Sequence, residues 1–474
     1  MSAFDKHLLN VALRSDLPTF IQRTFQTTDP GKTYEHNWHI DALSYELTRC
    51  ANGENNRLII TTAPRTLKSI CAFVAFPAWV LGHKPDARII CVSYSADLSA
   101  FHARQWRQVM NSGWYKKVFP MTRLSSVKNT ENESVTTANG FRYSTSVGGA
   151  LTGRGGDIII VDDPIKADDA MSAVKRSAVN EWFDSTLYSR LDDKRTGVII
   201  VVMQRLHVDD LVGHLLKTQN WVHLSLPAIA ELDQKVAIGP QRFYFRQSGE
   251  ILQPLRDSAE LLAQRKIEIG SFKFAAQYQQ RPIPPEGEIV KWSWFGRFDE
   301  LPKAKHGDYR IQSWDTAMTD GTSSDFSVCT TWYVQGANYY LVDLIRERLN
   351  YPDLRRRVID LALCWGATPL IEDKGSGTSL IQDLRYHGPK KPIAYKTEGD
   401  KLSRLVAQTP KIEAGHVFLP REAGWIDDFR EELLLFPHGH YDDQVDSLSQ
   451  FLNYVDQKRR FQTVVVPLSR FGVG

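Results

Sequence analysis

Lys68 and Ser69 follow a short apolar run and a loop in the segment LIITTAPRTLKSICAFVAF, residues 58–76. A buried strand, a short loop, Lys-Ser and an apolar helix, in this order, are typical of a phosphate-binding loop. In such a loop Lys68 reaches the β- and γ-phosphates of a nucleotide and Ser69 ligates Mg²⁺, while free N–H groups at the helix N-terminus face the phosphates. Thr62 and Leu67 replace both glycines of the usual motif, so this segment alone leaves a plain strand–turn–helix open.

Two acids, Asp162 and Asp163, end the apolar run DIIIVDD, residues 157–163. Open α/β sheets gather ligands at the carboxyl ends of their strands. Asp162 is expected to hold magnesium, and Asp163 to orient or deprotonate an attacking water, unless the pair only caps the next helix. Gln204 ends a third run, GVIIVVMQ, at the same sheet edge. Together these strand ends predict nucleotide hydrolysis at a site formed by Pro64, Arg65, Thr66, Leu67, Lys68, Ser69, Asp162 and Gln204.

Phosphoryl transfer also requires positive charge near the transition state. Arg65, inside the loop, is the first candidate for this role. Arg154, in the glycine-rich segment GGALTGRGGD (148–157), is the second. Either arginine could instead bind DNA phosphates.

A second set of acids lies in the C-terminal part of the chain. Asp315 falls in SWDTA, Glu372 in LIEDKGSG, and Asp442, Asp443 and Asp446 in HYDDQVDSLSQF. Carboxylates without sulfur ligands suit Mg²⁺ or Mn²⁺, and two such ions can activate water and stabilise the leaving oxygen of a phosphodiester. We predict that Asp315, Glu372 and Asp443 ligate this metal and carry out cleavage.

The choice among the three late acids stays open on spacing alone. Asp446 can share a helix face with Asp443, three residues before it, or with Asp442, four residues before it. Asp442 could equally be the N-cap of the helix. Asp325 and Asp373 are further acids nearby, expected to be turn residues or solvated.

The elements that position the first set form an α/β domain. The Val/Ile-rich runs 58–62, 87–95, 157–163, 197–204 and 221–227 alternate with helical patterns such as SICAFVAFPAWVLG, residues 69–82. Such short runs predict a mainly parallel sheet covered on both faces by helices, the arrangement of a P-loop NTPase.

A second α/β domain is expected after a linker. Residues 228–300 show no strong period and contain Pro282, Pro284 and Pro285. The runs 309–317, 326–334 and 339–348 are too close together for helical crossovers, so they predict an antiparallel meander that opens a mixed sheet, followed by a helix over 352–365 and a strand over 368–373. With an Asp on the first strand, a Glu ending a later one and an Asp opening a late helix, this describes an RNase H-like nuclease.

The predicted division of the chain is therefore fivefold. It comprises an N-terminal helical segment (1–56), the ATPase core (57–227), a linker or subdomain (228–300), the nuclease domain (301–457) and a basic tail (458–474).

Composition excludes several classes of protein. The 474 residues are 42% apolar and 24% charged, which argues against a disordered or fibrous chain. The longest apolar run, residues 70–82, is shorter than the roughly 20 residues that span a bilayer, and the N-terminus carries no secretory signal, so we expect a cytosolic protein without membrane contact. The five cysteines form no CxxC pair, which excludes the usual zinc spacings.

The net charge of +3 is too small to indicate a nucleic-acid partner, so such a contact can be predicted only from local clusters of basic residues. Residues 345–357 carry five arginines, and residues 457–474 carry Lys458, Arg459, Arg460 and Arg470 without an acid. Each run is expected to be either a DNA contact or a solvated face. The tail could also be a docking peptide for another protein.

An ATPase domain followed by such a nuclease resembles the large subunit of the DNA-packaging terminases of tailed phages. The phrases TTAPRTLKS, IIIVDDPIK, QRLHVDDLVG, SWDTA, LIEDKGSGTSL and HYDDQVDSLSQF carry the resemblance across residues 58–452. Family loops often have Pro-Arg with a degenerate glycine, so Leu67 resembles a known variant. The resemblance implies ATP with Mg²⁺ at the first site and Mg²⁺ or Mn²⁺ at the second.

The resemblance also assigns roles. Lys68 and Ser69 hold phosphate and magnesium, Arg65 acts on the transferring phosphoryl group, and Asp162 with Asp163 forms the metal and catalytic-acid pair. Gln204 falls in the element that couples hydrolysis to movement, although Met203 stands where the family often has Thr or Ser. Asp315, Glu372 and Asp443 correspond to the nuclease carboxylates, and residues 36–39 resemble the segment that packs the adenine.

The implied protein is a motor. With a small terminase subunit it recognises and cuts concatemeric double-stranded DNA, docks as a ring of five on the portal protein of an empty procapsid and translocates the duplex. It would act in the cytoplasm of the infected bacterium and be absent from the mature virion. The rivals are a helicase-nuclease of recombination or restriction, for which no second motor lobe is visible, and a DNA-binding scaffold with vestigial sites.

Overall fold

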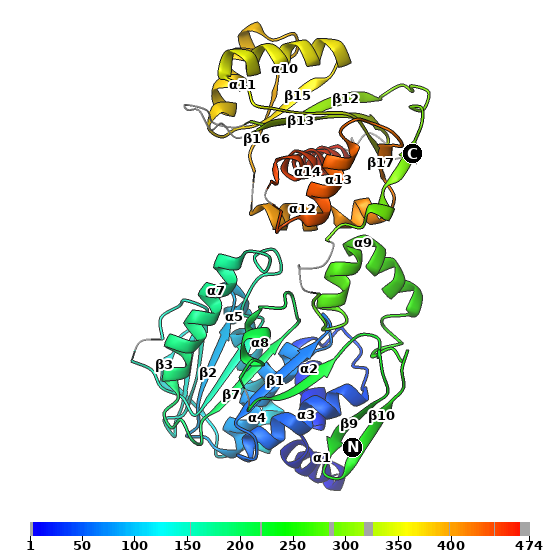
Figure 1. Ribbon diagram of the computed structural model, residues 1–474. Helices are drawn as coiled ribbons and strands as arrows, with labels where there is room; N and C mark the ends of the chain where they lie inside the picture. The colour runs from blue at the N-terminus through cyan, green and yellow to red at the C-terminus, as the bar shows by residue number, and fades with distance from the viewer. Residues whose placement is uncertain are drawn as a thin grey trace, which may run out of the picture. The chain divides into compact units, whose positions relative to one another are not determined.

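The chain folds into two compact units in the computed structural model (Figure 1). Residues 3–151, 153–218, 220–283, 289–316, 326–397, 399–439 and 441–464 are described. The first unit comprises Met1–Lys266 and Lys273–Ile283, and the second comprises Ile267–Phe272 and Pro284–Gly474. Asp325 and residues 465–474 of the basic tail, Arg470 included, lie outside the described residues.

A sheet of eight strands runs through the first unit in the order β3-β4-β5-β2-β6-β7-β1-β8. Its strands are β1 (Arg57–Thr62), β2 (Arg88–Ser93), β3 (Leu124–Asn129), β4 (Glu133–Thr136), β5 (Phe141–Ser146), β6 (Ile158–Asp162), β7 (Val198–Met203) and β8 (Val222–Leu226). The six strands from β5 to β8 in this order pair in parallel, and β3-β4-β5 form an antiparallel edge. The predicted parallel-rich sheet is confirmed, and the antiparallel edge was not predicted.

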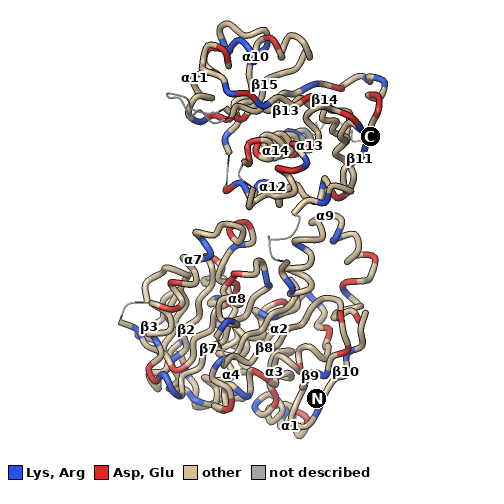
Figure 2. Tube along the Cα trace, viewed as in Figure 1, with Lys and Arg blue, Asp and Glu red and all other residues tan. Residues whose placement is uncertain are grey.

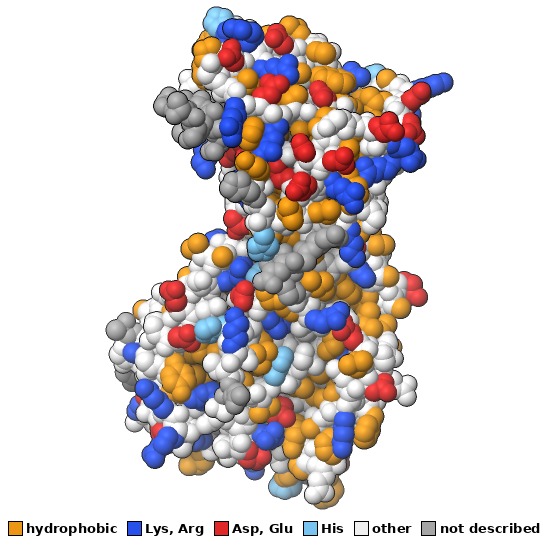
Figure 3. Space-filling model, in the orientation of Figure 1, with side chains coloured by type: hydrophobic (Ala, Val, Ile, Leu, Met, Phe, Trp, Pro, Cys, Tyr) orange, Lys and Arg blue, Asp and Glu red, His pale blue; other side chains and the backbone are white. Residues whose placement is uncertain are grey.

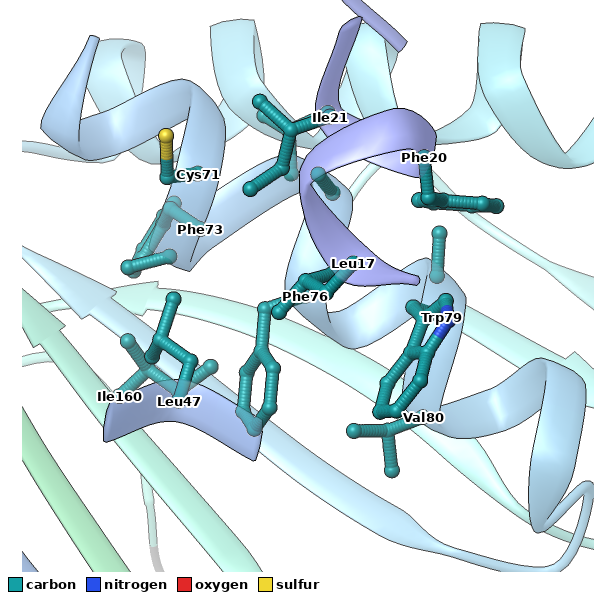
Figure 4. Close-up of a cluster of buried hydrophobic side chains, with 14 of the residues drawn as sticks. Leu17, Phe20, Ile21, Leu47, Cys71, Phe73, Phe76, Trp79, Val80 and Ile160 are labelled. Atoms are coloured by element: carbon teal, nitrogen blue, oxygen red, sulfur yellow. The ribbon is translucent and has the colours of Figure 1, made fainter. Parts of the chain in front are cut away.

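Helices cover both faces of this sheet. They are α1 (Ala3–Ser15), α2 (Leu17–Thr28), α3 (Trp38–Ala51), the π-helix η1 (Ile70–Ala75), α4 (Phe76–His83), α5 (Ala96–Asn111), α6 (Gly113–Val118), α7 (Ala173–Trp182), the π-helix η2 (Phe183–Leu187), the 3₁₀ helix η3 (Tyr188–Arg190) and α8 (Leu211–Leu215). Alternate residues of β6 enter different cores: Ile158 and Ile160 join α2, α3, η1 and α4 (Figure 4), and Ile159 and Val161 join α7 and η2. Burial on both faces is why these strands read as unbroken apolar runs.

The apolar helix expected over residues 69–82 is two helices of different kinds. Pro77 has no N–H to donate to the carbonyl of Phe73, four residues earlier, so the α-helical ladder cannot run through this point. The chain winds as a π-helix up to Ala75 and as an α-helix from Phe76. The buried Arg142 Nη2 donates to the Phe73 oxygen at 3.1 Å and replaces the missing bond.

Residues 228–300 contain elements of their own. A hairpin of β9 (Gln234–Gly239) and β10 (Arg242–Arg246) is followed by α9 (Ala259–Gln277), which is broken at Gly270 with φ 79°. Then come the short η4 (Trp292–Trp294) and β11 (Gly296–Phe298). The exposed faces of the hairpin and the kink in α9 leave little hydrophobic periodicity, which explains why the sequence predicted none of these elements.

The second unit is built on a seven-stranded mixed sheet in the order β11-β17-β14-β13-β12-β15-β16. Its remaining strands are β12 (Tyr309–Asp315), β13 (Ser327–Gln335), β14 (Asn338–Glu347), β15 (Thr368–Glu372), β16 (Ile393–Tyr395) and β17 (Val417–Pro420). β12, β13 and β14 form the predicted antiparallel meander, and β15 pairs with β12 in parallel. The helices are α10 (Tyr351–Trp365), α11 (Ser376–His387), α12 (Lys401–Glu413), α13 (Ile426–Leu435) and α14 (Asp443–Val464).

Helix α14 is anchored to the sheet by a buried serine. Figure 1 shows α10 and α11 on one face of the sheet and α12 and α14 on the other. The Ser447 hydroxyl lies 2.8 Å from the Ser313 oxygen of β12 and 2.7 Å from Thr330 Oγ1 of β13. Gln450 Nε2 donates to the carbonyls of Trp314 and Leu370, at 3.2 and 3.3 Å. These bonds fix the start of α14 against the end of β12.

We expect Ser447→Ala to lower the free energy of local opening of α14 by about 1–3 kcal/mol, because it leaves buried polar groups of the sheet unpaired. Hydrogen–deuterium exchange of peptides from α14 and β12 in the full chain measures this. Ser449→Ala is the matched control, since Ser449 is equally buried and its hydroxyl donates to the Asp446 oxygen within the helix instead of to the sheet. Equal exchange in the two variants would contradict the anchoring role.

No described helix is both long and apolar enough to cross a membrane. Acidic and basic side chains are interspersed over the visible face of each unit (Figure 3). This mixture agrees with the small net charge.

Candidate functional site

A cavity of about 1400 Å³ opens at the carboxyl edge of the first sheet. Pro64, Arg65, Thr66, Leu67, Lys68, Ser69, Asp163 and Gln204 all line it. The register explains the convergence: Asp162 of β6 lies opposite Val202 of β7, and Met203 opposite Thr61 of β1. The three strands therefore end at one level, and the loops that leave them meet.

Two donors converge on one oxygen of Asp163. Lys68 Nζ lies 2.9 Å from Asp163 Oδ1, and the Gln204 backbone N–H donates to the same oxygen at 3.1 Å. Asp163 adopts φ 42°, a left-handed conformation that turns its side chain at the strand end. The loop lysine and the strand-end acid are thus directly paired.

Asp162 lies beneath the cavity and is buried. Neither of its carboxylate oxygens has a hydrogen-bond partner among the described residues; the basic side chain in contact with it is His102, whose Nε2 lies 3.8 Å from Oδ2. Burial, and then the neighbouring charge of Asp163, raise the pKa of Asp162 to about 7, while Lys68 and the Ser69 hydroxyl lower it. A buried carboxylate without a partner, beside a serine hydroxyl, is a donor set that fits Mg²⁺.

The loop backbone is left-handed at two non-glycine residues, Arg65 (φ 61°) and Leu67 (φ 63°). At Leu67 this is the conformation for which the usual motif has glycine, and an L-residue there costs about 1–2 kcal/mol. The Leu67 side chain packs against the hydrophobic core beneath it, and such burial contributes about 1.5–3 kcal/mol when complete. Packing therefore offsets the strain.

We expect Leu67→Gly to have a free energy of unfolding about 1 kcal/mol higher than that of Leu67→Ala, and therefore a higher melting temperature. Both variants lose the packing, but only alanine keeps the left-handed strain. Thermal unfolding of the two full-length variants, compared with the wild type, measures the order. A higher melting temperature for the alanine variant would contradict the strained backbone.

Of the two candidate arginines, only Arg65 reaches the cavity. Its side chain is exposed, and Arg256 Nη1 donates to its backbone oxygen at 3.1 Å. Arg154 instead forms two hydrogen bonds with Glu133, at 2.7 and 3.1 Å, and lies 4.2 Å from the centre of the Tyr143 ring. Arg154 is thus occupied away from the phosphate loop.

The sequence did not point to the far wall of the cavity, which includes Tyr244 and residues 250–256. Tyr244 stacks on Trp38 with ring centres 4.4 Å apart. His39 Nε2 lies 3.2 Å from the Thr66 oxygen and 3.1 Å from Gln253 Nε2, so it links the phosphate loop to this wall. Tyr244 and residues 250–256 come from a segment without a recognisable pattern, and long-range packing brings them to the loop.

In the second unit the register brings two acids side by side. Trp314 of β12 lies opposite Ile371 of the parallel β15, so Asp315 and Glu372 come next on neighbouring strands. Glu372 Oε1 accepts a hydrogen bond from Thr397 Oγ1 at 2.7 Å. Asp315 is half-buried, and burial followed by the charges of Asp446, Asp443 and Glu372 raises its pKa to about 8.

The three acids of α14 have different partners. Asp446 is held by Lys401 and Arg404, each at 2.6 Å, and Asp442 by the same Lys401 at 2.6 Å. Figure 2 shows acidic and basic positions in the region of α12 and α14. Within the part of the chain that the structure describes, the ion pair of Asp443 is a long one, 3.9 Å to Arg346.

Burial, and then Glu432 and Asp442, raise the pKa of Asp443 to about 6. The described residues contain no group of three or more His, Cys, Asp or Glu side chains already spaced as a metal site. The carboxylates are close enough to interact electrostatically, and Lys401 and Arg404 neutralise part of their charge. Of the three late acids, Asp443 is the one that strong ion pairs leave available.

Asp442 does not perform the capping that its position suggested as an alternative. The backbone N–H groups of Gln444 and Val445 donate to Glu432 Oε1, at 2.6 and 3.2 Å. Glu432 of α13, which the sequence did not single out, therefore accepts hydrogen bonds from the free N–H groups at the start of α14. Asp373, the other acid considered, accepts a hydrogen bond from Thr378 Oγ1 at 2.9 Å, as expected of a turn residue.

A family model described as the terminase RNase H-like domain matches residues 312–455. This match confirms the RNase H-like fold of the second unit and the resemblance to large terminase subunits. No protein with a curated description matches the sequence.

Among solved structures, the large terminase of a thermophilic bacteriophage in complex with ATP-γ-S is 12% identical, with 86% of this chain and 98% of that chain covered and a TM-score of 0.48. The large terminase of bacteriophage HK97 is 10% identical, with 93% and 99% covered and a TM-score of 0.35. The large terminase nuclease of the thermophilic phage G20c with bound cobalt is 14% identical, with 36% and 98% covered and a TM-score of 0.29.

Proposed function

We propose that this chain, whose residues 312–455 match the model of the terminase RNase H-like domain, is the motor and nuclease subunit of a phage DNA-packaging machine. It hydrolyses ATP to translocate double-stranded DNA into a procapsid, and it cuts concatemeric DNA with its second unit. The observation that carries the proposal is the pairing of Lys68 with Asp163 at the end of a parallel sheet, in the same chain as the buried acids around Asp315.

At the first site, Lys68 binds the β- and γ-phosphates and Ser69 and Asp162 hold Mg²⁺, which supplies charge neutralisation to the transferring phosphoryl group. Lys68 Nζ lies 2.9 Å from Asp163 Oδ1. When Lys68 turns to the phosphates, Asp163 is released to orient and deprotonate the attacking water. Arg65 lies within the loop to contact the γ-phosphoryl group, and Gln204, held to Asp163 by its backbone, responds to the nucleotide state.

At the second site, Asp315, Glu372 and Asp443 hold Mg²⁺ or Mn²⁺, which activates water and stabilises the leaving oxygen of the phosphodiester. Asp315 and its neighbour Glu372 supply two of these ligands from the ends of two parallel strands. Asp443 adds a ligand from α14, whose start is fixed by Ser447 and Glu432.

The packaging role implies partners. The subunit works with a small terminase subunit, with the portal protein of the procapsid and with further copies of itself in a ring of five on the portal. It acts in the cytoplasm of the infected bacterium and leaves the capsid before the virion matures.

We expect wild type and Lys68→Ala to cleave supercoiled plasmid in Mg²⁺ or Mn²⁺, and Asp315→Ala not to cleave. ATP turnover should follow the opposite order, lost in Lys68→Ala and kept in Asp315→Ala, because each substitution removes the chemistry of one unit only. Gel electrophoresis and phosphate release measure the two activities on the same preparations. Cleavage that survives Asp315→Ala would contradict the assigned nuclease, and ATP turnover that survives Lys68→Ala would contradict the assigned ATPase.

Asp443→Asn should reduce cleavage by about 100-fold, because a metal ligand is lost and the loss of even an outer-shell partner costs about 10–100-fold. Asp442→Asn should stay within a few-fold of the wild type, since Asp442 contacts only Lys401 among the described side chains. Initial cleavage rates at saturating Mg²⁺ measure both. If the two variants exchanged their behaviour, Asp442 and not Asp443 would be the ligand from α14.

A further inference from the structure

The arginine-rich segment 345–357 divides into two groups once its partners are known. The three arginines on α10 are all in ion pairs: Arg355 with Asp383, Arg356 with Asp353 and Arg357 with Glu347. The other two, Arg346 and Arg348, lie at and just beyond the end of β14. Residues two apart on a strand point to the same side, so these two guanidinium groups lie on one side of the strand end.

Aromatic rings hold both of these arginines in place. The guanidinium carbon of Arg346 lies 4.1 Å from the ring centres of Phe326 and Tyr441. That of Arg348 lies 4.5 Å from the centre of Phe326. Cation–π contact with two rings fixes the plane of Arg346 without using any of its N–H donors.

The donors of Arg346 are poorly satisfied. Among the described carboxylates Asp443 is in ion-pair range, but Nη2 and Oδ2 are 3.9 Å apart, too far for a hydrogen bond. Nε and Nη2 are buried and have no hydrogen-bond partner among the described residues. Glu432, the other acid that faces Arg346, is engaged by Gln444 and the start of α14. Buried N–H donors without partners are costly unless an anion completes them.

We propose that Arg346 binds a DNA phosphate at the metal site and that Arg348 binds the neighbouring phosphate of the same strand. The inference rests on the proposed nuclease function and adds a catalytic residue to it. Arg346 lies beside Asp443, so a phosphodiester held by the metal would meet its planar fork of donors. Two N–H groups of an arginine match two phosphate oxygens, which a lysine cannot do.

The first test measures binding without cleavage. In the full-length Asp315→Ala background, duplex DNA binding is followed by fluorescence anisotropy at several salt concentrations. Adding Arg346→Gln should weaken binding and lower the salt slope by about one, the change expected for one lost phosphate contact. Arg310→Gln is the matched control, because Arg310 also lies over an aromatic ring, Tyr333 at 5.6 Å, but at the opposite end of β12, about 17 Å along the strand from Asp315.

The second test measures chemistry. In the otherwise wild-type chain, Arg346→Gln should lower kcat for cleavage by about 100-fold or more, since loss of one donor to the transition state has this effect. Arg346→Lys should recover part of the loss, and millimolar guanidinium should partly rescue Arg346→Ala by entering the space between Phe326 and Tyr441. A merely structural arginine would not be rescued in this way.

The outcomes separate the two proposals. If the wild type does not cleave, the nuclease function fails, and the binding test still decides on Arg346. The proposed phosphate contact is wrong if adding Arg346→Gln leaves the affinity and salt slope of the Asp315→Ala protein unchanged. It is also wrong if Arg346→Gln cleaves as fast as Arg310→Gln.

Discussion

Repulsion between carboxylates held close together at strand ends is the constraint on which both units depend. In the first unit Asp162 ends β6 and Asp163 follows it, and the buried Asp162 has a raised pKa. In the second unit Asp315 faces the charges of Glu372, Asp443 and Asp446. Groups of like charge in a poorly hydrated place are stable only with cations beside them. Each unit supplies such cations: Lys68 in the first, and Lys401, Arg404 and Arg346 in the second.

The fold is arranged to keep these acids together. The parallel pairs β6-β7-β1 and β12-β15 bring strand ends to the same level. Helix α14 is tied to the sheet through Ser447 and Gln450, and its first turn is satisfied by Glu432 from α13. The buried bonds around the acids hold the carboxylates together, so the energy of packing opposes the repulsion.

Much of this arrangement is readable in the sequence. Strands buried on both faces give unbroken apolar runs, and the short spacing of 309–348 leaves room only for a meander, so the two sheets and the strand-end acids could be predicted. The partners of those acids, Glu432, Lys401 and Arg404, could not be predicted. They reach the site through the packing of helices, which leaves no local pattern in the sequence. The hairpin β9-β10 and the wall around Tyr244 were missed for the same reason. Leu67 shows a further limit. A leucine at this position of the motif argues against a phosphate-binding loop, but Leu67 adopts the left-handed φ of 63° that glycine usually provides, and its side chain packs on the core.

We propose that the acids around Asp315 form a cation site in the second unit that is independent of the first unit. Calorimetric titration of the nucleotide-free full chain with Mn²⁺ tests it directly, on the wild type, Asp315→Asn and Asp162→Asn. We expect Asp315→Asn to abolish one binding event that Asp162→Asn retains. Identical titrations of the wild type and Asp315→Asn would contradict the claim, because the acids would then be balanced by Lys401 and Arg404 alone.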